Sequence, residues 1–107
     1  MSFRVELSHD ADADLIRLAD YIAAHHSIEQ AVYVLTKLEE VIGKLASFPD
    51  RGNHPPELLA LGIREYRQVF FKPFRVIYRV VGNRVVVLLI ADGRRDMAAL
   101  LADRLLG

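Results

Sequence analysis

The chain has 107 residues, of which 52% are hydrophobic and 26% are charged, and it contains no cysteine. The length predicts a single domain over residues 1–107, and the lack of cysteine excludes disulfides, thiol catalysis and cysteine-ligated zinc. The formal net charge is zero, but residues 1–61 hold 5 basic and 10 acidic side chains, whereas residues 62–107 hold 9 basic and 4 acidic ones. Such an asymmetry predicts that the C-terminal half meets an anionic partner.

The first half of the chain predicts one strand and two helices. Residues 3–7 alternate apolar and charged side chains, as a half-buried strand does. Ser8 is placed to cap a helix that ends at His25-His26. Ser27 and Gln30 have the spacing of a capping box, and the helix that they begin ends before Pro49. Because the connection is so short, the two helices are expected to form an antiparallel hairpin.

The second half predicts a surface loop, three strands and a final helix. The loop covers residues 49–63, and the strands cover 64–71, 74–81 and 84–91, with turns at Lys72-Pro73 and Gly82-Asn83. The last strand is apolar from Val85 onward, so it is expected to be central and covered on both faces. Asp96 is expected to cap a short C-terminal helix.

The element order is therefore β-α-α-β-β-β-α, an α+β fold with a helical hairpin packed on a small antiparallel-rich sheet. The side chains expected in or beside the core are Leu35, Leu38, Ile42, Val76, Tyr78, Val87 and Leu89.

The sequence gives little support for a metal site or for a catalytic nucleophile. Asp10, Asp12 and Asp14 resemble the start of a calcium loop, but Leu15 stands where glycine is needed and Tyr21 where glutamate is needed. Adjacent histidines on a helix point to different sides, so His25-His26 is better read as a helix end. We expect no metal site and no cofactor.

Location also follows from composition. Charges interrupt the N-terminus where a signal peptide needs an apolar region, and the longest apolar run, residues 85–91, is far shorter than the ~20 residues of a membrane span. We therefore expect a cytoplasmic protein with no membrane contact.

Basic side chains are the remaining candidates for a site. On the strand 74–81, Arg75, Ile77 and Arg79 share one face, and the opposite face is apolar. We expect Arg75 and Arg79 to face solvent or a partner, the alternative being that they pair with the acidic helices. Arg94-Arg95 follows the last strand at the mouth of the sheet, where Arg95 alternatively pairs with Asp92 or Asp96.

Several of these segments resemble one known family. The element order, FPDRG at 48–52, FRVIYRV at 74–80 and LLIADGRRD at 88–96 look like the RelE/ParE superfamily of toxins from type II toxin–antitoxin systems. RelE-like members are ribosome-dependent mRNA endoribonucleases with a basic cluster and commonly a C-terminal tyrosine. Arg75 and Arg95 match that cluster and would be catalytic in a ribonuclease, but no tyrosine follows Arg95.

The lack of that tyrosine makes the chain resemble the ParE-like branch more closely. That resemblance implies inhibition of DNA gyrase without catalysis, and neutralisation by a ParD-like antitoxin in a hetero-oligomer. A RelE-like ribonuclease and an inactive antitoxin-binding remnant are the alternatives. The expected target-binding residues are Arg94, Arg95 and Arg104, and the expected antitoxin-binding residues are Arg75, Arg79 and Arg84. No direct specific DNA binding is expected, because a net charge of zero is poor for gripping phosphates.

Overall fold

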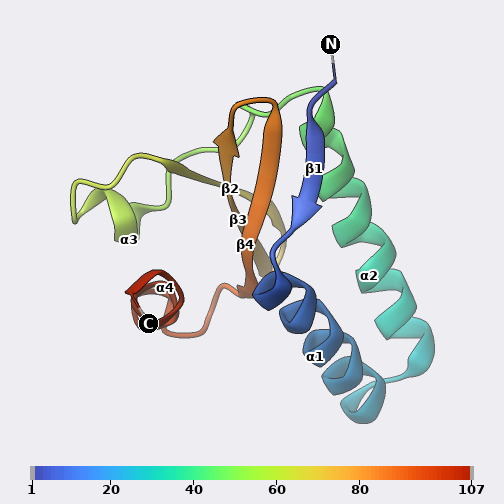
Figure 1. Ribbon diagram of the computed structural model, residues 1–107. Helices are drawn as coiled ribbons and strands as arrows, with labels where there is room; N and C mark the ends of the chain where they lie inside the picture. The colour runs from blue at the N-terminus through green and yellow to red at the C-terminus, as the bar shows by residue number, and fades with distance from the viewer. Residues whose placement is uncertain (1, 107) are drawn as a thin grey trace.

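The computed structural model describes residues 2–106, and it confirms the α+β fold (Figure 1). The sheet has the strand order β1-β4-β3-β2; β1 runs parallel to β4, and the other neighbours are antiparallel. A short α3 lies in the segment 49–63 that was expected to be a plain loop, and a 3-10 turn, η1, directly follows α2 ahead of that segment. In chain order the elements are β1 (Arg4–Leu7), α1 (His9–His25), α2 (Ile28–Gly43), η1 (Lys44–Ala46), α3 (Pro56–Leu59), β2 (Tyr66–Phe71), β3 (Phe74–Val81), β4 (Arg84–Asp92) and α4 (Met97–Leu106).

The helices begin where the capping residues predict. The Ser8 hydroxyl accepts a hydrogen bond from the Ala11 amide at 3.1 Å, and Ser27 does the same for Gln30 at 3.0 Å. Asp96 accepts from the amide of Ala99 at 3.0 Å ahead of α4. Each cap satisfies an amide that has no partner inside its own helix, which fixes where that helix starts.

The helical hairpin of α1 and α2 packs against one face of the sheet and forms the larger core. Leu38, Ile42, Val76, Tyr78 and Val87 are all buried there, as the sequence predicts. Leu35, which was also expected in or beside the core, is only partly buried. We call this cluster the first core.

A register shift in β4 places apolar residues on both of its faces. Tyr78 of β3 lies opposite Val87, and Ile77 lies opposite Leu89, so Leu88 has no cross-strand partner. This bulge returns Ile90 to the first core and turns Leu89 to the opposite face. The unbroken apolar run is thereby explained, and β4 is the central strand that it predicted.

A second core lies on the opposite face, under α3 and α4. Figure 1 shows these two helices on the side of the sheet away from α1 and α2. The prediction that Arg75, Ile77 and Arg79 share a face open to solvent is therefore wrong for part of that face: Ile77 is fully buried and Arg75 is 8% exposed. The members of the second core are Leu58, Ile77, Leu89, Ala91, Met97 and Leu101.

The segment between α2 and β2 is fastened to the sheet by Tyr78. Its hydroxyl donates to the Pro49 carbonyl at 2.7 Å and accepts from the Gly52 amide at 3.2 Å. A Cβ at Gly52 would lie 2.4 Å from the Gln68 carbonyl oxygen, so glycine is required for this close approach. Burial raises the pKa of Tyr78 above its ordinary value.

No helix in residues 2–106 has the length and apolar character that a membrane crossing requires.

Candidate functional site

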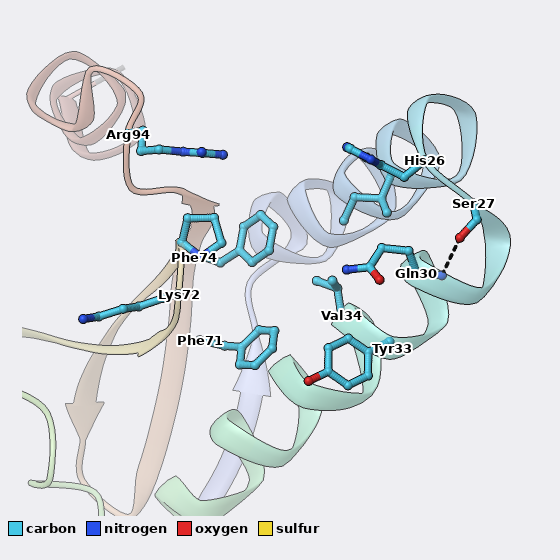
Figure 2. Close-up of a pocket in the computed structure, with 11 residues that line it drawn as sticks. His26, Ser27, Gln30, Tyr33, Val34, Phe71, Lys72, Phe74 and Arg94 are labelled. Carbon is cyan, nitrogen blue, oxygen red and sulfur yellow. Dashed lines mark hydrogen bonds between the residues drawn. The ribbon is translucent and has the colours of Figure 1, made fainter.

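A two-part hollow lies where the tip of the helical hairpin meets the β2–β3 turn and the segment after β4. Its parts have volumes of about 610 and 740 Å³. They adjoin, since Ile22, His26, Phe74 and Arg94 line both. Figure 2 shows Arg94 pointing across the opening toward His26, with Phe74 between the two sides. We call this hollow the cleft.

The cleft combines an apolar floor with a cationic rim. Ile22 and Phe74 are buried side chains of its floor. The Lys and Arg side chains that line it are Arg17, Lys72, Arg94, Arg95 and Arg104, and they outnumber the carboxylates there, which are Asp14, Asp92 and Asp103. This arrangement suits a partner that presents apolar side chains together with carboxylates, because each half of the cleft then meets its complement.

Arg94 is oriented by the aspartate at the end of β4. Its Nε and Nη2 donate to the two Asp92 carboxylate oxygens at 3.0 and 2.6 Å, yet its side chain remains 77% exposed. Hydrogen bonding from Arg94 lowers the pKa of Asp92. The alternative role considered for Arg95, pairing with Asp92, thus belongs to Arg94. Arg95 is exposed and forms no ion pair with any residue in the described part of the chain.

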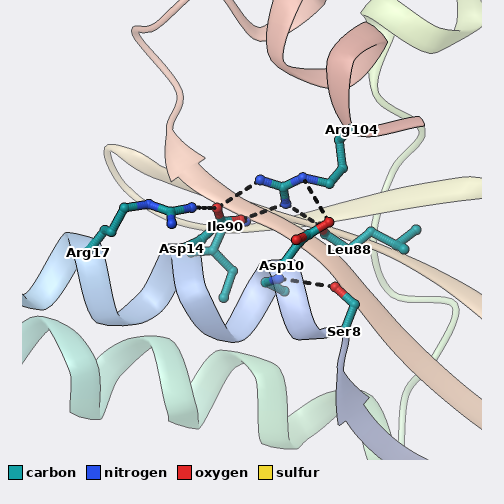
Figure 3. Close-up of polar contacts among 8 residues, drawn as sticks. Ser8, Asp10, Asp14, Arg17, Leu88, Ile90 and Arg104 are labelled. Carbon is teal, nitrogen blue, oxygen red and sulfur yellow. Dashed lines mark hydrogen bonds and ion pairs between the residues drawn. The ribbon is translucent and has the colours of Figure 1, made fainter. Parts of the chain in front are cut away.

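Arg104, expected to bind a target, contacts α1 and β4 instead of projecting outward (Figure 3). Its Nη1 and Nη2 donate to the two oxygens of Asp14 at 2.8 and 2.9 Å, and Nη1 also donates to the Leu88 carbonyl at 2.7 Å. The Ile90 amide donates to Asp14 at 3.0 Å. The Asp14 carboxylate raises the pKa of Arg104. Contact between Arg104 and a target stays a prediction.

The reason for this network lies in the strand lengths. β1 ends at Leu7, opposite Val87, so the edge of β4 beyond that point has no neighbouring strand. The bulge also leaves the Leu88 carbonyl free, and a buried peptide group without a partner is costly. Asp14 and Arg104 supply the missing acceptor and donor, with side chains only 7% and 17% exposed.

The side chain of Arg75, on the face of the sheet that carries the second core, is even less exposed than that of Arg104, at 10% against 17%. Its Nη1 and Nη2 donate to the two Glu57 oxygens at 2.9 and 2.7 Å, and its Nε donates to Gln68 at 2.8 Å. The hydrogen bonds from Arg75 lower the pKa of Glu57. A Cβ at Gly93 would lie 2.7 Å from Arg75 Cδ, so the arginine stem fills the space beside that glycine. Sequence reasoning missed Glu57, because it lies in the segment expected to be loop.

The other two expected antitoxin contacts, Arg79 and Arg84, are less enclosed. Arg84 donates to Glu6 at 2.8 Å, with 44% of its side chain exposed. The Arg79 guanidinium lies 5.7 Å from the centre of the Tyr66 ring. Its Nε is buried and has no hydrogen-bond acceptor among residues 2–106. Within the same residues, no three histidine, aspartate or glutamate side chains gather as a metal site requires.

The fold is shared with structures from toxin–antitoxin systems. A structure of the chromosomal ParDE system from P. aeruginosa matches with a TM-score of 0.71 and 20% identity, over 85% of this chain and 96% of the other. The RelBE2 toxin–antitoxin complex from Mycobacterium tuberculosis matches with a TM-score of 0.59 and 21% identity, over 86% and 99%. At 20% and 21% identity, these two matches show that the chain shares the fold of these structures.

The sequence comparisons show the family to which the chain belongs. The family described as the ParE toxin of the type II toxin–antitoxin system parDE matches residues 5–97. Toxin ParE3 of Caulobacter vibrioides is 32% identical over 101 residues, which cover 94% of this chain and 97% of that protein. The chain belongs to the ParE toxin family, and it is a toxin of the type II toxin–antitoxin class.

Proposed function

We propose that this toxin arrests bacterial growth by binding DNA gyrase without catalysing a reaction itself. The observation that carries the proposal is the exposed pair Arg94 and Arg95, which line the cleft beside its apolar floor. Arginine beside apolar pockets is typical of residues that dominate the binding energy of protein interfaces. Membership of the ParE family supports gyrase as the target.

The environment of Arg75 favours this function over mRNA cleavage. In the ribonuclease alternative, Arg75 and Arg95 would act on RNA. Arg75 is only 8% exposed and is already neutralised by Glu57, so it is poorly available to a phosphate. Cleavage by 2′-OH attack also needs a general base, and no tyrosine follows Arg95 to take a role in catalysis.

A cognate ParD-like antitoxin is the proposed partner that keeps the toxin inactive. Two of the matching structures are described as a ParDE system and as a RelBE2 toxin–antitoxin complex. We expect acidic antitoxin side chains to meet the basic half of the chain. Among the three arginines predicted for this contact, Arg79 and Arg84 are better placed than Arg75, whose charge Glu57 already balances. Toxin, antitoxin and gyrase would then meet in the cytoplasm.

Pulse labelling of DNA and protein synthesis after induction tests the target. We expect DNA synthesis to fall first, and purified toxin to inhibit gyrase supercoiling. The double variant Arg94→Gln, Arg95→Gln should lose both effects, whereas Arg51→Gln, an exposed arginine outside the cleft, should retain them. Early loss of protein synthesis with A-site cleavage of message would instead support a ribonuclease. Antitoxin binding without growth arrest would indicate an inactive remnant.

A further inference from the structure

The face of the sheet that carries the second core has an open end. β1 and the start of β4 lie side by side there, with Arg4 directly opposite Arg84. On the other side of β4, Arg79 of β3 lies opposite Val86, two residues along from Arg84. Since alternate residues of a strand share a face, the three arginines lie on one face of three adjacent strands. We call Arg4, Arg79 and Arg84 the arginine row.

The charges of the arginine row are poorly compensated within the molecule. Arg4 is exposed and its side chain forms no ion pair with the rest of residues 2–106. Among the described residues Arg84 forms an ion pair only with Glu6, whose side chain is itself 35% exposed. Arg79 forms no ion pair with the described residues, and its buried Nε lacks an acceptor.

Two of these features cost stability. Like charges directly opposite each other on neighbouring strands repel, and Arg4 faces Arg84 in this way. A buried donor without an acceptor loses the hydrogen bond that it makes to water in the unfolded chain, and the Nε of Arg79 is such a donor. Both features meet at one end of one face, whereas Arg75 on the same strand has all of its groups satisfied. An external acceptor would remove both costs.

The Arg79 side chain is also held in position before any partner arrives. The Tyr66 ring, which packs against the second core, supports it from β2. A guanidinium that is fixed over an aromatic ring loses less freedom on binding than a mobile one, and it keeps its Nη donors for a ligand. Val81 and Val86 lie on the same face beside it and are partly exposed.

We propose that the arginine row receives the carboxylates of an acidic, apolar segment of a polypeptide. This inference rests on the proposed function, because the antitoxin is the partner that would supply the segment. In an extended chain, alternate side chains point to one side about 6.6 Å apart, and neighbouring strands lie about 4.8 Å apart. Arg4 and Arg84 are one strand spacing apart, and Arg79 lies one strand and two residues from Arg84, about 8 Å away. The spacing of alternate carboxylates falls between these two separations, and the long arginine side chains take up the difference. The intervening region of the segment covers Val81 and Val86.

A peptide suits the arginine row better than a nucleic acid does. Glu6 lies within the row, bound to Arg84, and would repel a continuous line of phosphates. The chain has a formal net charge of zero, whereas nucleic-acid binding depends on an excess of phosphate-neutralising cations. A segment with a few separated carboxylates avoids Glu6 and still meets the three arginines.

Fluorescence anisotropy with the full chain tests the inference. The probe is a fluorescein-labelled peptide of alternating glutamate and leucine, and the variants are Arg4→Gln, Arg79→Gln and Arg84→Gln. Each should weaken binding about tenfold, as expected for the loss of one charge-assisted hydrogen bond. Arg51→Gln, an exposed arginine outside the row, should bind like the unaltered chain. Arg79→Glu should instead favour a matching peptide of lysine and leucine.

The outcomes separate this inference from the proposed function. Equal binding by the row variants and by Arg51→Gln overturns the inference. So does preferred binding of a single-stranded oligonucleotide of equal charge that the same variants abolish. A purely structural role of Arg79 would lower the midpoint of thermal unfolding in Arg79→Gln and leave peptide binding unchanged. Growth arrest and antitoxin co-purification test the proposed function without the peptide, so either idea can fail alone.

Discussion

The two ends of the sheet face that carries the second core give arginine side chains different environments. Arg75 and Arg79 are four positions apart on β3 and point to the same side. At the closed end, Arg75 is 8% exposed and makes hydrogen bonds to Glu57 and Gln68. At the open end, Arg79 rests on Tyr66 without an ion pair to any described residue. Residue type and spacing alone therefore do not tell a structural arginine from one that is available to a partner.

Coverage by α3 and α4 produces the difference. These helices exclude water from the closed end, where a charge is tolerated only with a fixed counter-charge and full hydrogen bonding. The open end is partly solvated, so water takes up part of the charge of Arg4 and Arg84 there. Substitutions at the closed end should mainly change stability, and those at the open end should mainly change binding.

The largest effect is expected from Asp14→Ala at the closed end. The variant leaves the mostly buried Arg104 with only the exposed Asp10, at 3.9 Å, as a counter-charge, and it removes the acceptor of the Ile90 amide. Breaking such a pair should lower the free energy of unfolding by about 3–5 kcal/mol, measured by urea denaturation. Asp12→Ala, which removes an exposed acid from the first turn of α1, should lower it by about 0.3–1 kcal/mol. Similar small losses in both variants would show that the network contributes little.

Arg75→Ala tests the comparison directly against Arg79→Ala. Removing Arg75 leaves Glu57 without its counter-charge and Gln68 without its donor. We expect the free energy of unfolding to fall by about 2–4 kcal/mol, which is less than for a fully buried pair because Glu57 remains 24% exposed. Arg79→Ala removes a cation–π contact and an unsatisfied donor together, so its loss should stay below about 1 kcal/mol. Equal losses in urea denaturation would mean that the two ends are not energetically different.

Acid should weaken the closed end through Glu57. Its pKa is lowered from the ordinary value of 4.5 by the hydrogen bonds from Arg75. A lowered folded-state pKa contributes stability above the unfolded-state value, and this contribution is lost as pH falls through the folded-state pKa. The unaltered chain should therefore lose more stability than Glu57→Gln between about pH 6 and pH 3. Parallel profiles of the two proteins in thermal unfolding would contradict this role of Glu57.

The smallest effect is expected from Arg4→Gln at the open end. Relief of repulsion between Arg4 and Arg84 should leave the free energy of unfolding unchanged or raise it by up to about 0.5 kcal/mol. Thermal unfolding with Arg51→Gln as the matched variant measures this small difference. A loss above about 1 kcal/mol would show that Arg4 stabilises the fold, and would weaken the view that the open end is kept for binding.

The sequence by itself determined the elements whose signals are local. Capping by Ser8, Ser27 and Asp96 and the apolar run of β4 depend on residues a few positions apart. These signals were enough for the helical hairpin, the central strand and the resemblance to the family. They also singled out Arg94-Arg95, because the pair directly follows a strand whose end was plain from its composition.

Tertiary structure alone decided which arginines are engaged. Arg104 and Asp14 are 90 positions apart, and Arg75 and Glu57 are 18 apart, so no local pattern links them. The bulge at Leu88 and the early end of β1 create the need for Asp14 and Arg104, and both follow from how strands pair. Composition gives the number of charges, but only packing sets how much water each one keeps, and hence whether it must be paired.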